Sequence, residues 1–367
     1  MRVTYSQYLR VRLCFDATLS YIKVLSARRK IKLQARLSGS DLKVGSCNIS
    51  GALRSSDNKH ISPMSSPFTS ISNPLATIAQ LQSSGSQLDG ISPDLERSIF
   101  FAGSALTQSA GVLLRLPQDL IAKAIVIFQR FWLGPEGGSL LDTGAEDISA
   151  ASIYLVTKPS AHVRSPRSIL NVYAYLSAVR HRSPENHKSI DALDPEMYYL
   201  SEGTYQSCRA TLLKHESLIL RHLGFQLHVA LPYTLCLNYL QTLEVFLPPY
   251  ASRGSALAKR AMAYLNTALL SPQLLYLTHQ PPALAVAAIY LAARDEAVKL
   301  PEEEWWEVFD CEREELGFLC VGMLSLAGFV SEERRMWQER GRAVPLTVGE
   351  VVKEVRKRGD EVERNGG

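Results

Sequence analysis

The sequence lacks an uninterrupted apolar run of about 18 residues, the length that a membrane-spanning helix requires, so we expect no membrane partner. It also lacks the phosphate-binding loop of nucleotide hydrolases, the His-Glu-x-x-His pair of zinc proteases and the Gly-x-Ser-x-Gly turn of serine hydrolases. Its six cysteines and eight histidines show no ligand spacing. We therefore expect reduced cysteines that pack in the interior, no metal, no cofactor and no catalytic residue.

Positive charge is scarce outside the amino-terminal region. The chain has a net charge of +4, but residues 1–60 hold twelve Lys and Arg against three Asp, a balance of +9. Subtracting this +9 from the total of +4 leaves −5 for the remainder. Proteins that bind nucleic acid through a folded domain normally present a basic face there. We therefore expect no direct nucleic-acid contact from the folded part.

The first 91 residues are expected to form a disordered basic extension rich in Ser and Pro. Its basic centre is Arg28-Arg29-Lys30. Residues 61–93 are polar and interrupted by Pro and Gly, which predicts a flexible linker. Three interpretations of residues 1–60 are open: a mitochondrial targeting segment, a basic extension of the nuclear type, and an artefact of gene prediction.

From residue 94 onward, apolar residues recur at spacings of three and four, which predicts an all-α fold. Pro and Gly at the breaks separate five helices, the first capped by Ser92, and the count of five then starts again. Two tandem five-helix domains are therefore predicted, over residues 92–228 and 229–330. The expected helices are 95–116, 118–132, 146–158, 166–180 and 203–223, then 232–246, 255–270, 281–294, 303–309 and 311–329.

The third helix of each set contains nearly the same short sequence, Ile153-Tyr154-Leu155 in the first and Ile289-Tyr290-Leu291 in the second, among small residues. Small side chains let neighbouring helices approach from several sides, so we expect each third helix to be the central one. The two copies end on a cation, Lys158 and Arg294. Such a cation either complements the helix dipole or faces a partner, and the pattern alone leaves both interpretations open.

Residues 331–367 are predicted to form a charged carboxy-terminal helix or tail. Nine basic and eight acidic residues alternate there, around a short apolar stripe of Val348, Val351, Val352 and Val355. A stripe of this kind docks either on its own chain or on a partner.

Four stretches resemble the cyclin family, and within it the L-type cyclins. They are residues 111–118, residues 128–131, the passage that joins the two boxes (220–229 and then 239–244), and residues 288–294; these four stretches occur in the order that the family shows. The resemblance covers about residues 92–330 and implies two tandem cyclin boxes.

The resemblance implies a site that binds a cyclin-dependent protein kinase. In cyclins a Lys that ends the third helix and a Glu inside the fifth grip the mobile regulatory helix of the kinase, and the matching positions are Lys158 and Glu216. By the same alignment an apolar floor is expected, although its leucines are equally well explained as core residues. The floor residues are Leu155, Pro159, Leu220 and Leu227.

The sequence also departs from the family pattern. Cyclins usually follow that Lys with an acidic pair, whereas this chain has Pro159-Ser160. The docking patch of cell-cycle cyclins is replaced by residues 99–103, which favours a transcription- or splicing-type cyclin. The Arg/Ser-rich tail of L-type cyclins is also missing from this sequence.

These features predict a non-catalytic regulatory subunit that binds and activates a cyclin-dependent kinase in the nucleus, in RNA polymerase II transcription or pre-mRNA splicing. Two other functions remain as hypotheses. One is a nucleic-acid-binding scaffold of the general-transcription-factor type, which the −5 balance disfavours. The other is an interaction module that binds a kinase without activating it.

Overall fold

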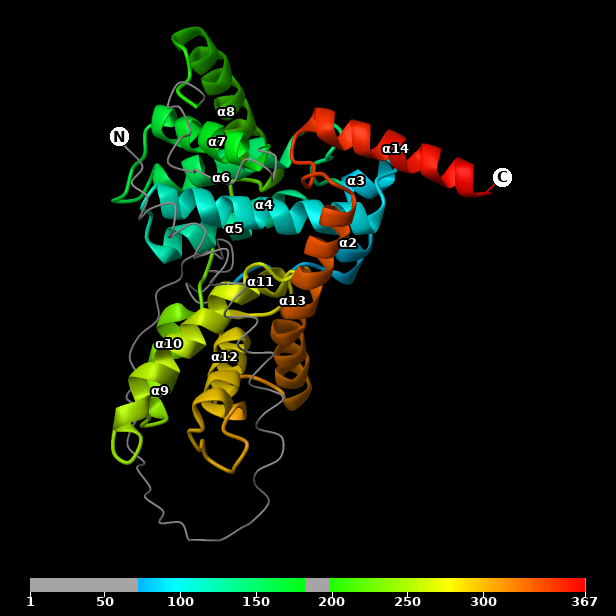
Figure 1. Cartoon of the computed structure of the whole chain (residues 1–367). Coiled ribbons are helices and arrows are strands. Elements are labelled where there is room, and N and C mark those ends of the chain that lie inside the picture. Colours follow the sequence, from blue (N-terminus) through cyan, green and yellow to red (C-terminus); the bar gives the residue numbers. More distant parts are fainter. Residues whose placement is uncertain (1–71, 182–197, 367) are drawn as a thin grey trace, which may run out of the picture.

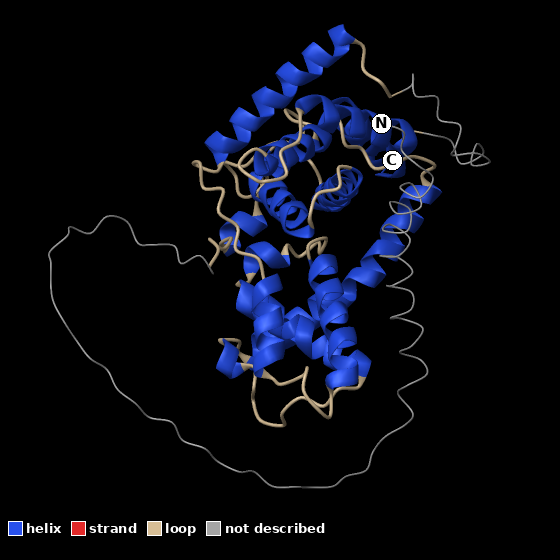
Figure 2. Ribbon diagram, turned by 90° about the vertical axis from the view of Figure 1, so that its left-hand side faces the viewer, coloured by secondary structure: helices blue, strands red, loops and turns tan. Residues whose placement is uncertain are grey.

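The computed structural model describes residues 72–181 and 198–366. The regular secondary structure of these residues is entirely helical, joined by loops (Figures 1 and 2). Two helical bundles lie one above the other in Figure 1, in keeping with the all-α prediction. The upper bundle, box 1, contains α4 (Pro93–Leu113), α5 (Gln118–Phe131), α6 (Ala145–Thr157), α7 (Pro166–Arg180) and α8 (Glu202–His222).

The lower bundle, box 2, departs from the expected helices in two places. The predicted helix 303–309 is reduced to the 3-10 turn η4 (Glu307–Phe309), and an additional short helix, α11 (Leu275–Thr278), precedes the central one. The remaining helices of box 2 are α9 (Tyr233–Thr242), α10 (Ala251–Ala268), α12 (Pro281–Glu296) and α13 (Arg313–Glu339).

The third helix of each box is central, as the small residues indicated. Helix α6 packs against α4, α5, α7 and α8, and α12 packs against α9, α10 and α13. Almost every side chain of α6 is buried, so its polar groups need partners inside the bundle. Ser149 provides one such contact, with its hydroxyl 2.6 Å from that of Thr107 and 2.5 Å from that of Tyr173.

The aromatic core of box 1 depends on glycine at two close approaches. A Cβ atom at Gly103 would lie 2.4 Å from Cζ of Phe128, and one at Gly138 would lie 2.1 Å from Cε1 of Phe131. Both phenylalanines are fully buried beside Trp132. Alanine at either position would therefore force rigid core rings to move.

Residues 72–91 correct the predicted boundary of the extension, because they pack against both boxes. They contain the short helices α2 (Ile78–Gln82) and α3 (Gly85–Leu88). Two of the Ser residues that suggested a flexible linker are buried hydrogen-bonding groups: Ser86 accepts from the backbone N–H of Leu140 at 3.1 Å, and Ser84 bonds to Glu96. Residues 1–71, the rest of the predicted extension, lie outside the described residues.

Asn73 links this segment to both boxes. Its side-chain amide donates to the carbonyl of Ala230 at 2.9 Å and accepts from the N–H of the same residue at 2.8 Å. Arg130 of α5 donates to Asn73 Oδ1 at 3.3 Å and to the carbonyl of His228 at 2.6 Å. Asn73 is only 5% exposed, so these contacts hold together the linker between the boxes and the end of α5.

The carboxy-terminal region returns from box 2 to box 1. Helix α13 continues past the predicted end of box 2 as far as Glu339, and α14 (Val348–Gly366) follows a short loop. Leu346 and Val351 are buried, and the carbonyl of Leu346 accepts from the N–H of Glu146 at the start of α6. The valine stripe therefore docks within the chain, on box 1 and not on box 2, which precedes it in the sequence (Figure 1).

Helix α13 is also long and apolar enough to cross a membrane by length and composition alone, and among the described residues it is the one helix that meets this test. Its Leu316, Leu319 and Met323 are buried in the core of box 2. Core helices meet the same test, and these contacts explain the apolar composition of its first half.

The contacts of Asn73 predict a substantial loss of stability on Asn73→Ala. The change leaves the N–H and the carbonyl of Ala230 without their partners, and an unsatisfied buried polar group typically costs about 1–3 kcal/mol. We expect chemical denaturation followed by circular dichroism to show this decrease. Asn238→Ala, at an exposed position of α9, is the matched control. Equal effects of the two changes would show that the Asn73 contacts do not stabilise the fold.

Glu146, beneath the docked segment, predicts a pH dependence of stability. Burial raises the pKa of Glu146 to about 7, although the cation of Arg180, 3.3 Å away, acts in the opposite direction. Between the ordinary value near 4.5 and about 7, the unfolded chain releases this proton while the folded chain keeps it. Stability should therefore fall as pH rises through this window, by at most about 3 kcal/mol from this group, and stay level above it.

Glu146→Gln removes this titration. We expect the melting temperature of the variant to fall less than that of the wild type between pH 5 and 7.5, with Glu314→Gln, exposed on α13, behaving like the wild type. Parallel curves for Glu146→Gln and the wild type would contradict the assignment.

Candidate partner-binding site

Lys158 and Glu216 lie 58 residues apart in the sequence and form an ion pair at the surface of box 1. Lys158 is the C-cap of α6, Glu216 lies inside α8, and the two helices pack side by side. The Lys158 Nζ atom lies 2.6 Å from Glu216 Oε1. The side chain of Glu216 is 9% exposed and that of Lys158 is 49% exposed, so the cation covers the carboxylate and faces solvent.

The surroundings of Lys158 keep it charged. The hydrogen bond to Glu216 raises the pKa of Lys158, and partial burial opposes this only in part. The ring of Tyr154 lies 5.0 Å from the ammonium group, at a distance suited to a cation–π contact. Because its ammonium group bonds to Glu216, Lys158 does more here than complement the α6 dipole.

The predicted apolar floor is divided between the core and the surface. Leu155 is 5% exposed and belongs to the core of box 1. Leu220 and Leu227 are partly buried and pack on the edge of that core, while Pro159 is exposed beside Lys158. Three of the four residues are therefore at least partly exposed: Pro159 directly after Lys158, Leu220 one turn after Glu216 on α8, and Leu227 in the segment that follows α8.

Sequence reasoning missed an exposed aromatic residue in the turn directly after α8, Phe225. Its side chain is 70% exposed, and its backbone has φ of 61°, a left-handed conformation that is uncommon for an aromatic residue. Its N–H donates to the carbonyl of Leu220 at 2.9 Å, which ties the turn to the end of α8. The preceding Gly224 is the one signal in the sequence: it predicts that the helix ends there, but it does not predict that the next side chain is exposed.

The loop after Lys158 is held by hydroxyl and backbone groups where cyclins usually carry two carboxylates. The Ser160 hydroxyl donates to the carbonyl of Thr157 at 2.9 Å and accepts from the N–H of His162 at 3.0 Å. Arg164 donates to the carbonyl of Leu114 at 3.0 Å, which fixes the loop to the end of α4. The loop therefore has a defined shape and a basic character.

The second copy of the repeated sequence, in α12, lacks an ion pair like that of Lys158 with a residue on another helix of the described chain. Arg294 Nη2 lies 3.8 Å from the carboxylate of its chain neighbour Asp295. That carboxylate binds Arg260 at 2.7 Å and the hydroxyl of Tyr264 at 2.7 Å. Asp295 of α12 is thus already bound by two residues of α10, and the two copies differ at their ends.

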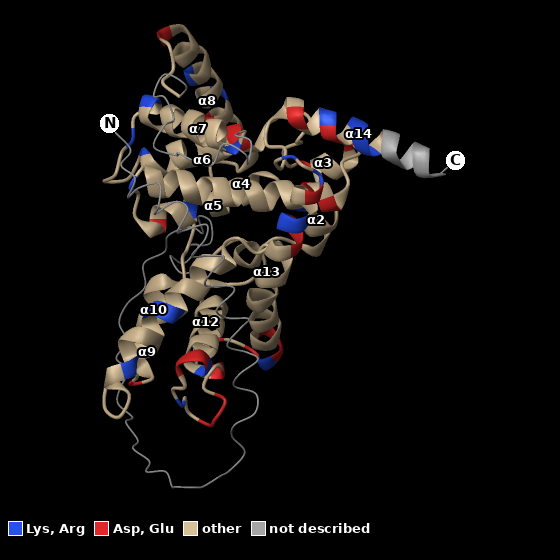
Figure 3. Ribbon diagram, viewed as in Figure 1, with Lys and Arg blue, Asp and Glu red and all other residues tan. Residues whose placement is uncertain are grey.

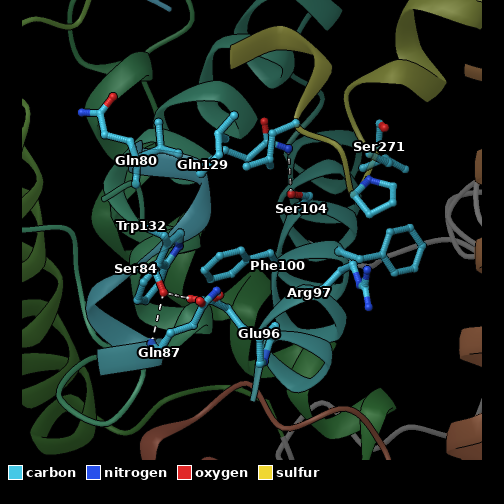
Figure 4. Close-up of a pocket in the computed structure, with 17 residues that line it drawn as sticks. Gln80, Ser84, Gln87, Glu96, Arg97, Phe100, Ser104, Gln129, Trp132 and Ser271 are labelled. Atoms are coloured by element: carbon cyan, nitrogen blue, oxygen red, sulfur yellow. Dashed lines mark hydrogen bonds between the residues drawn. The ribbon is translucent and has the colours of Figure 1, made fainter. Parts of the chain in front are cut away.

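A cavity of about 200 Å³ lies between the boxes, away from the ion pair (Figure 4). Its walls come from residues 80–87, α4, α5 and residues 270–274. Glu96 on its wall is held by Gln87 at 2.6 Å, and Gln129 donates across the seam to the carbonyl of Leu269 at 2.8 Å. The first contact joins the amino-terminal segment to α4, and the second joins the two boxes. Among the described residues, no group of three or more His, Cys, Asp or Glu is arranged to hold a metal.

The chain is similar in sequence to L-type cyclins. It is 32% identical to Cyclin-L1 of Gallus gallus over 243 residues, covering 66% of this chain and 41% of that protein. It is 31% identical to Cyclin-L2 of Homo sapiens over 248 residues, covering 67% and 44%. The chain thus spans less than half the length of these relatives. No family model matches it.

Among solved structures, the fold is similar to a chain of the yeast RNA Pol II CTD kinase CTDK-1 complex. The TM-score is 0.53 and the identity 14%, over 81% of this chain and 84% of the other. This likeness concerns the fold alone.

The geometry of the ion pair predicts measurable coupling between Lys158 and Glu216. Lys158→Ala leaves a nearly buried carboxylate without its cation, whereas adding Glu216→Gln removes that charge as well. We therefore expect the double variant to lose less stability than the sum of the single changes, with a coupling of about 1 kcal/mol for this half-exposed pair. Asp119 and Lys123, exposed and 3.9 Å apart on α5, form the control pair. Equal coupling in both pairs would contradict a special role of Glu216.

Proposed function

Since the chain belongs to the cyclin family, we propose that it binds a cyclin-dependent protein kinase as a regulatory subunit and activates it. The observation that carries this proposal is the ion pair between Lys158 and Glu216, whose geometry suits the capture of a partner helix. The catalytic residues would be those of the kinase, and this chain would provide a binding surface.

The ion pair suits this role because it is organised before the partner arrives. A free lysine side chain loses rotamer freedom when it is fixed at an interface, and that loss opposes binding. Here Glu216 already holds Lys158 at 2.6 Å, while about half of the lysine side chain stays open to solvent. The ammonium group can therefore donate to a carbonyl at the end of a partner helix while it keeps its bond to Glu216.

Apolar contact would come from the residues around the pair. Pro159 follows Lys158, Leu220 lies one turn after Glu216, and the partly exposed Leu227 and the exposed Phe225 follow the end of α8. Aromatic side chains are enriched at the centres of interfaces because they bury a large area at low entropic cost. We include Phe225 in the proposed kinase-binding surface with Lys158, Glu216 and the three floor residues. Leu155, buried in the core, would support that surface from beneath.

Activation would be a shift of population in the kinase. Phosphoryl transfer in protein kinases requires a Lys–Glu ion pair that includes the regulatory helix and a metal-binding Asp in place. A surface that binds the regulatory helix only in its active position raises the population of that state. From the resemblance to L-type cyclins, we place this activity in the nucleus, in transcription by RNA polymerase II or in splicing.

Recruitment of kinase by the full chain tests the proposal. The tagged protein is co-expressed with a panel of cyclin-dependent kinases, and bound kinase and its activity are measured after capture. We expect Lys158→Ala and Glu216→Gln to lower recruitment at least about tenfold, in line with the 2–5 kcal/mol usual for one partner of a buried charge contact. Arg294→Ala, at the matching end of α12, is the control and should recruit like the wild type.

Two results would contradict this function. If the wild type recruits no kinase, or if both variants recruit as well as the wild type, the proposed surface is wrong. If the wild type recruits a kinase without raising its activity, the chain is a non-activating interaction module. The replacement of the usual acidic pair by Pro159-Ser160 makes that outcome a specific alternative.

A further inference from the structure

Three arginines converge on one buried carboxylate at the junction of α13 and α14. Glu354 of α14 is bound by Arg340 at 2.9 Å, by Arg342 at 3.1 Å and by Arg358 at 3.0 Å. Its side chain is 4% exposed, whereas those of the arginines are 21–29% exposed. The guanidinium groups therefore separate the carboxylate from solvent. We call these four residues the arginine cluster.

The arginine cluster has more positive charge than its acid can neutralise. Three guanidinium groups against one carboxylate leave a local charge of +2. The imbalance extends along the segment, because residues 340–358 contain six Lys and Arg and two Glu, which gives +4. In Figure 3 the ribbon of the described part of α14 is coloured blue at several of its positions, which marks Lys and Arg. Residues 331–367 as a whole are nearly neutral, so this local excess of positive charge does not appear in their composition.

Hydrogen-bond donors also remain in the arginine cluster. Each guanidinium group has five N–H donors, and one carboxylate offers about four acceptor positions. The Nε atom of Arg342 is buried and has no acceptor among the described residues. Arg358 reaches the hydroxyl of Ser92 at 3.3 Å, and this hydroxyl makes no bond to the helix amides that it was expected to cap. The amino-terminal end of α4, with its positive dipole, thus lies beside the cluster.

From this geometry we propose that the arginine cluster is a binding site for a phosphorylated Ser or Thr side chain in a peptide. A phosphoserine carries a charge of about −1.5 to −2 at pH 7 and offers three acceptor oxygens, which matches the local charge of +2 and the partly exposed guanidinium groups. A carboxylate ligand would supply half of that charge. The phosphate would lie on the solvent side of the guanidinium groups, with Glu354 fixing their orientation from beneath.

A peptide suits the site better than RNA does. Binding of single-stranded nucleic acid combines a basic groove with aromatic rings on which bases stack. The aromatic ring at the cluster, Trp337, is 6% exposed and lies beneath Arg340, whose guanidinium carbon is 5.5 Å from the ring centre. That ring is therefore covered, and the cluster matches one phosphate at a time.

The site lies at the opposite end of box 1 from the proposed kinase-binding surface. The loop before α14 binds the start of α6 through Glu146, and Lys158 lies at its end. The 13 residues of α6 separate the two ends by about 20 Å. This inference rests on the proposed function for its meaning: a kinase produces phosphoserine, and a phosphate site on its regulatory subunit would retain a substrate that is already phosphorylated.

Fluorescence anisotropy of the full chain with a labelled Ser-Pro peptide tests the site, at an ionic strength of about 0.15 M. We expect the singly phosphorylated peptide to bind and the unphosphorylated one to bind at least about tenfold more weakly. Arg342→Gln and Arg358→Gln should each lower the affinity about tenfold, the result of losing about 1.4 kcal/mol. Arg334→Gln, exposed on α13 outside the cluster, is the matched control.

A second variant separates binding from folding, since loss of an arginine also exposes the charge of Glu354. Glu354→Gln keeps all three arginines and removes the competing carboxylate, so it should bind the phosphopeptide at least as tightly as the wild type. If the cluster serves only to brace α14, Glu354→Gln will show no phosphate-dependent binding. Inorganic phosphate should compete with the peptide, and failure to compete would contradict recognition of the phosphate.

Other outcomes overturn the proposal separately from the proposed function. Equal affinity for the two peptides, or tighter binding of an RNA oligonucleotide than of the phosphopeptide, would show that the cluster is not a phosphopeptide site. Kinase recruitment by Arg342→Gln should equal that of the wild type, because Lys158 and Glu216 are unchanged. Loss of recruitment in this variant would contradict the separation of the two surfaces.

Discussion

A helix that is surrounded by other helices can present side chains to a partner only at its ends. Helix α6 is in this position, and its buried side chains are mostly small or apolar, with the Ser149 hydroxyl bonded to hydroxyls of the neighbouring helices α4 and α7. Its two ends then become the places where box 1 meets other groups. At the carboxy-terminal end Lys158 emerges and meets Glu216, and at the amino-terminal end Glu146 meets the returning carboxy-terminal segment. The proposed kinase-binding surface therefore depends on the burial of this helix.

The two boxes are held together by hydrogen bonds between side chains of one part of the chain and the backbone of another. Asn73 hydrogen-bonds to Arg130 of α5 and to the linker at Ala230, and Gln129 reaches the carbonyl of Leu269. On the other side, α13 leaves box 2 and α14 lies on box 1. The chain therefore crosses between the boxes at both of its described ends. This arrangement fixes box 2 relative to the proposed kinase-binding surface without involving box 2 in it.

The parts that could be predicted from sequence are those set by local periodicity. The five helices of box 1 and the central place of α6 follow from apolar spacing and small residues, which act within a few turns of a helix. The boundary at residue 91 was wrong because Ser84 and Ser86 look like linker residues until their partners in box 1 are known. The length of α13 was missed because the charged residues after Ser331 indicate exposure to solvent, and exposure does not show where a helix ends. The pairing of Lys158 with Glu216 entered through family resemblance, since helical spacing cannot relate residues on different helices.

The sequence by itself determined the helical content, the repetition of the domain and the two cations that end the repeated sequence. Only the tertiary structure decided that these cations differ, because the carboxylate near Lys158 comes from α8 and the one near Arg294 is already bound by Arg260. The arginine cluster has the same origin: residues 331–367 are nearly balanced in charge, and the fold gathers three arginines around one acid. Local pattern fixes which side chains lie on one helix. The distances between charges on different helices depend on how those helices pack.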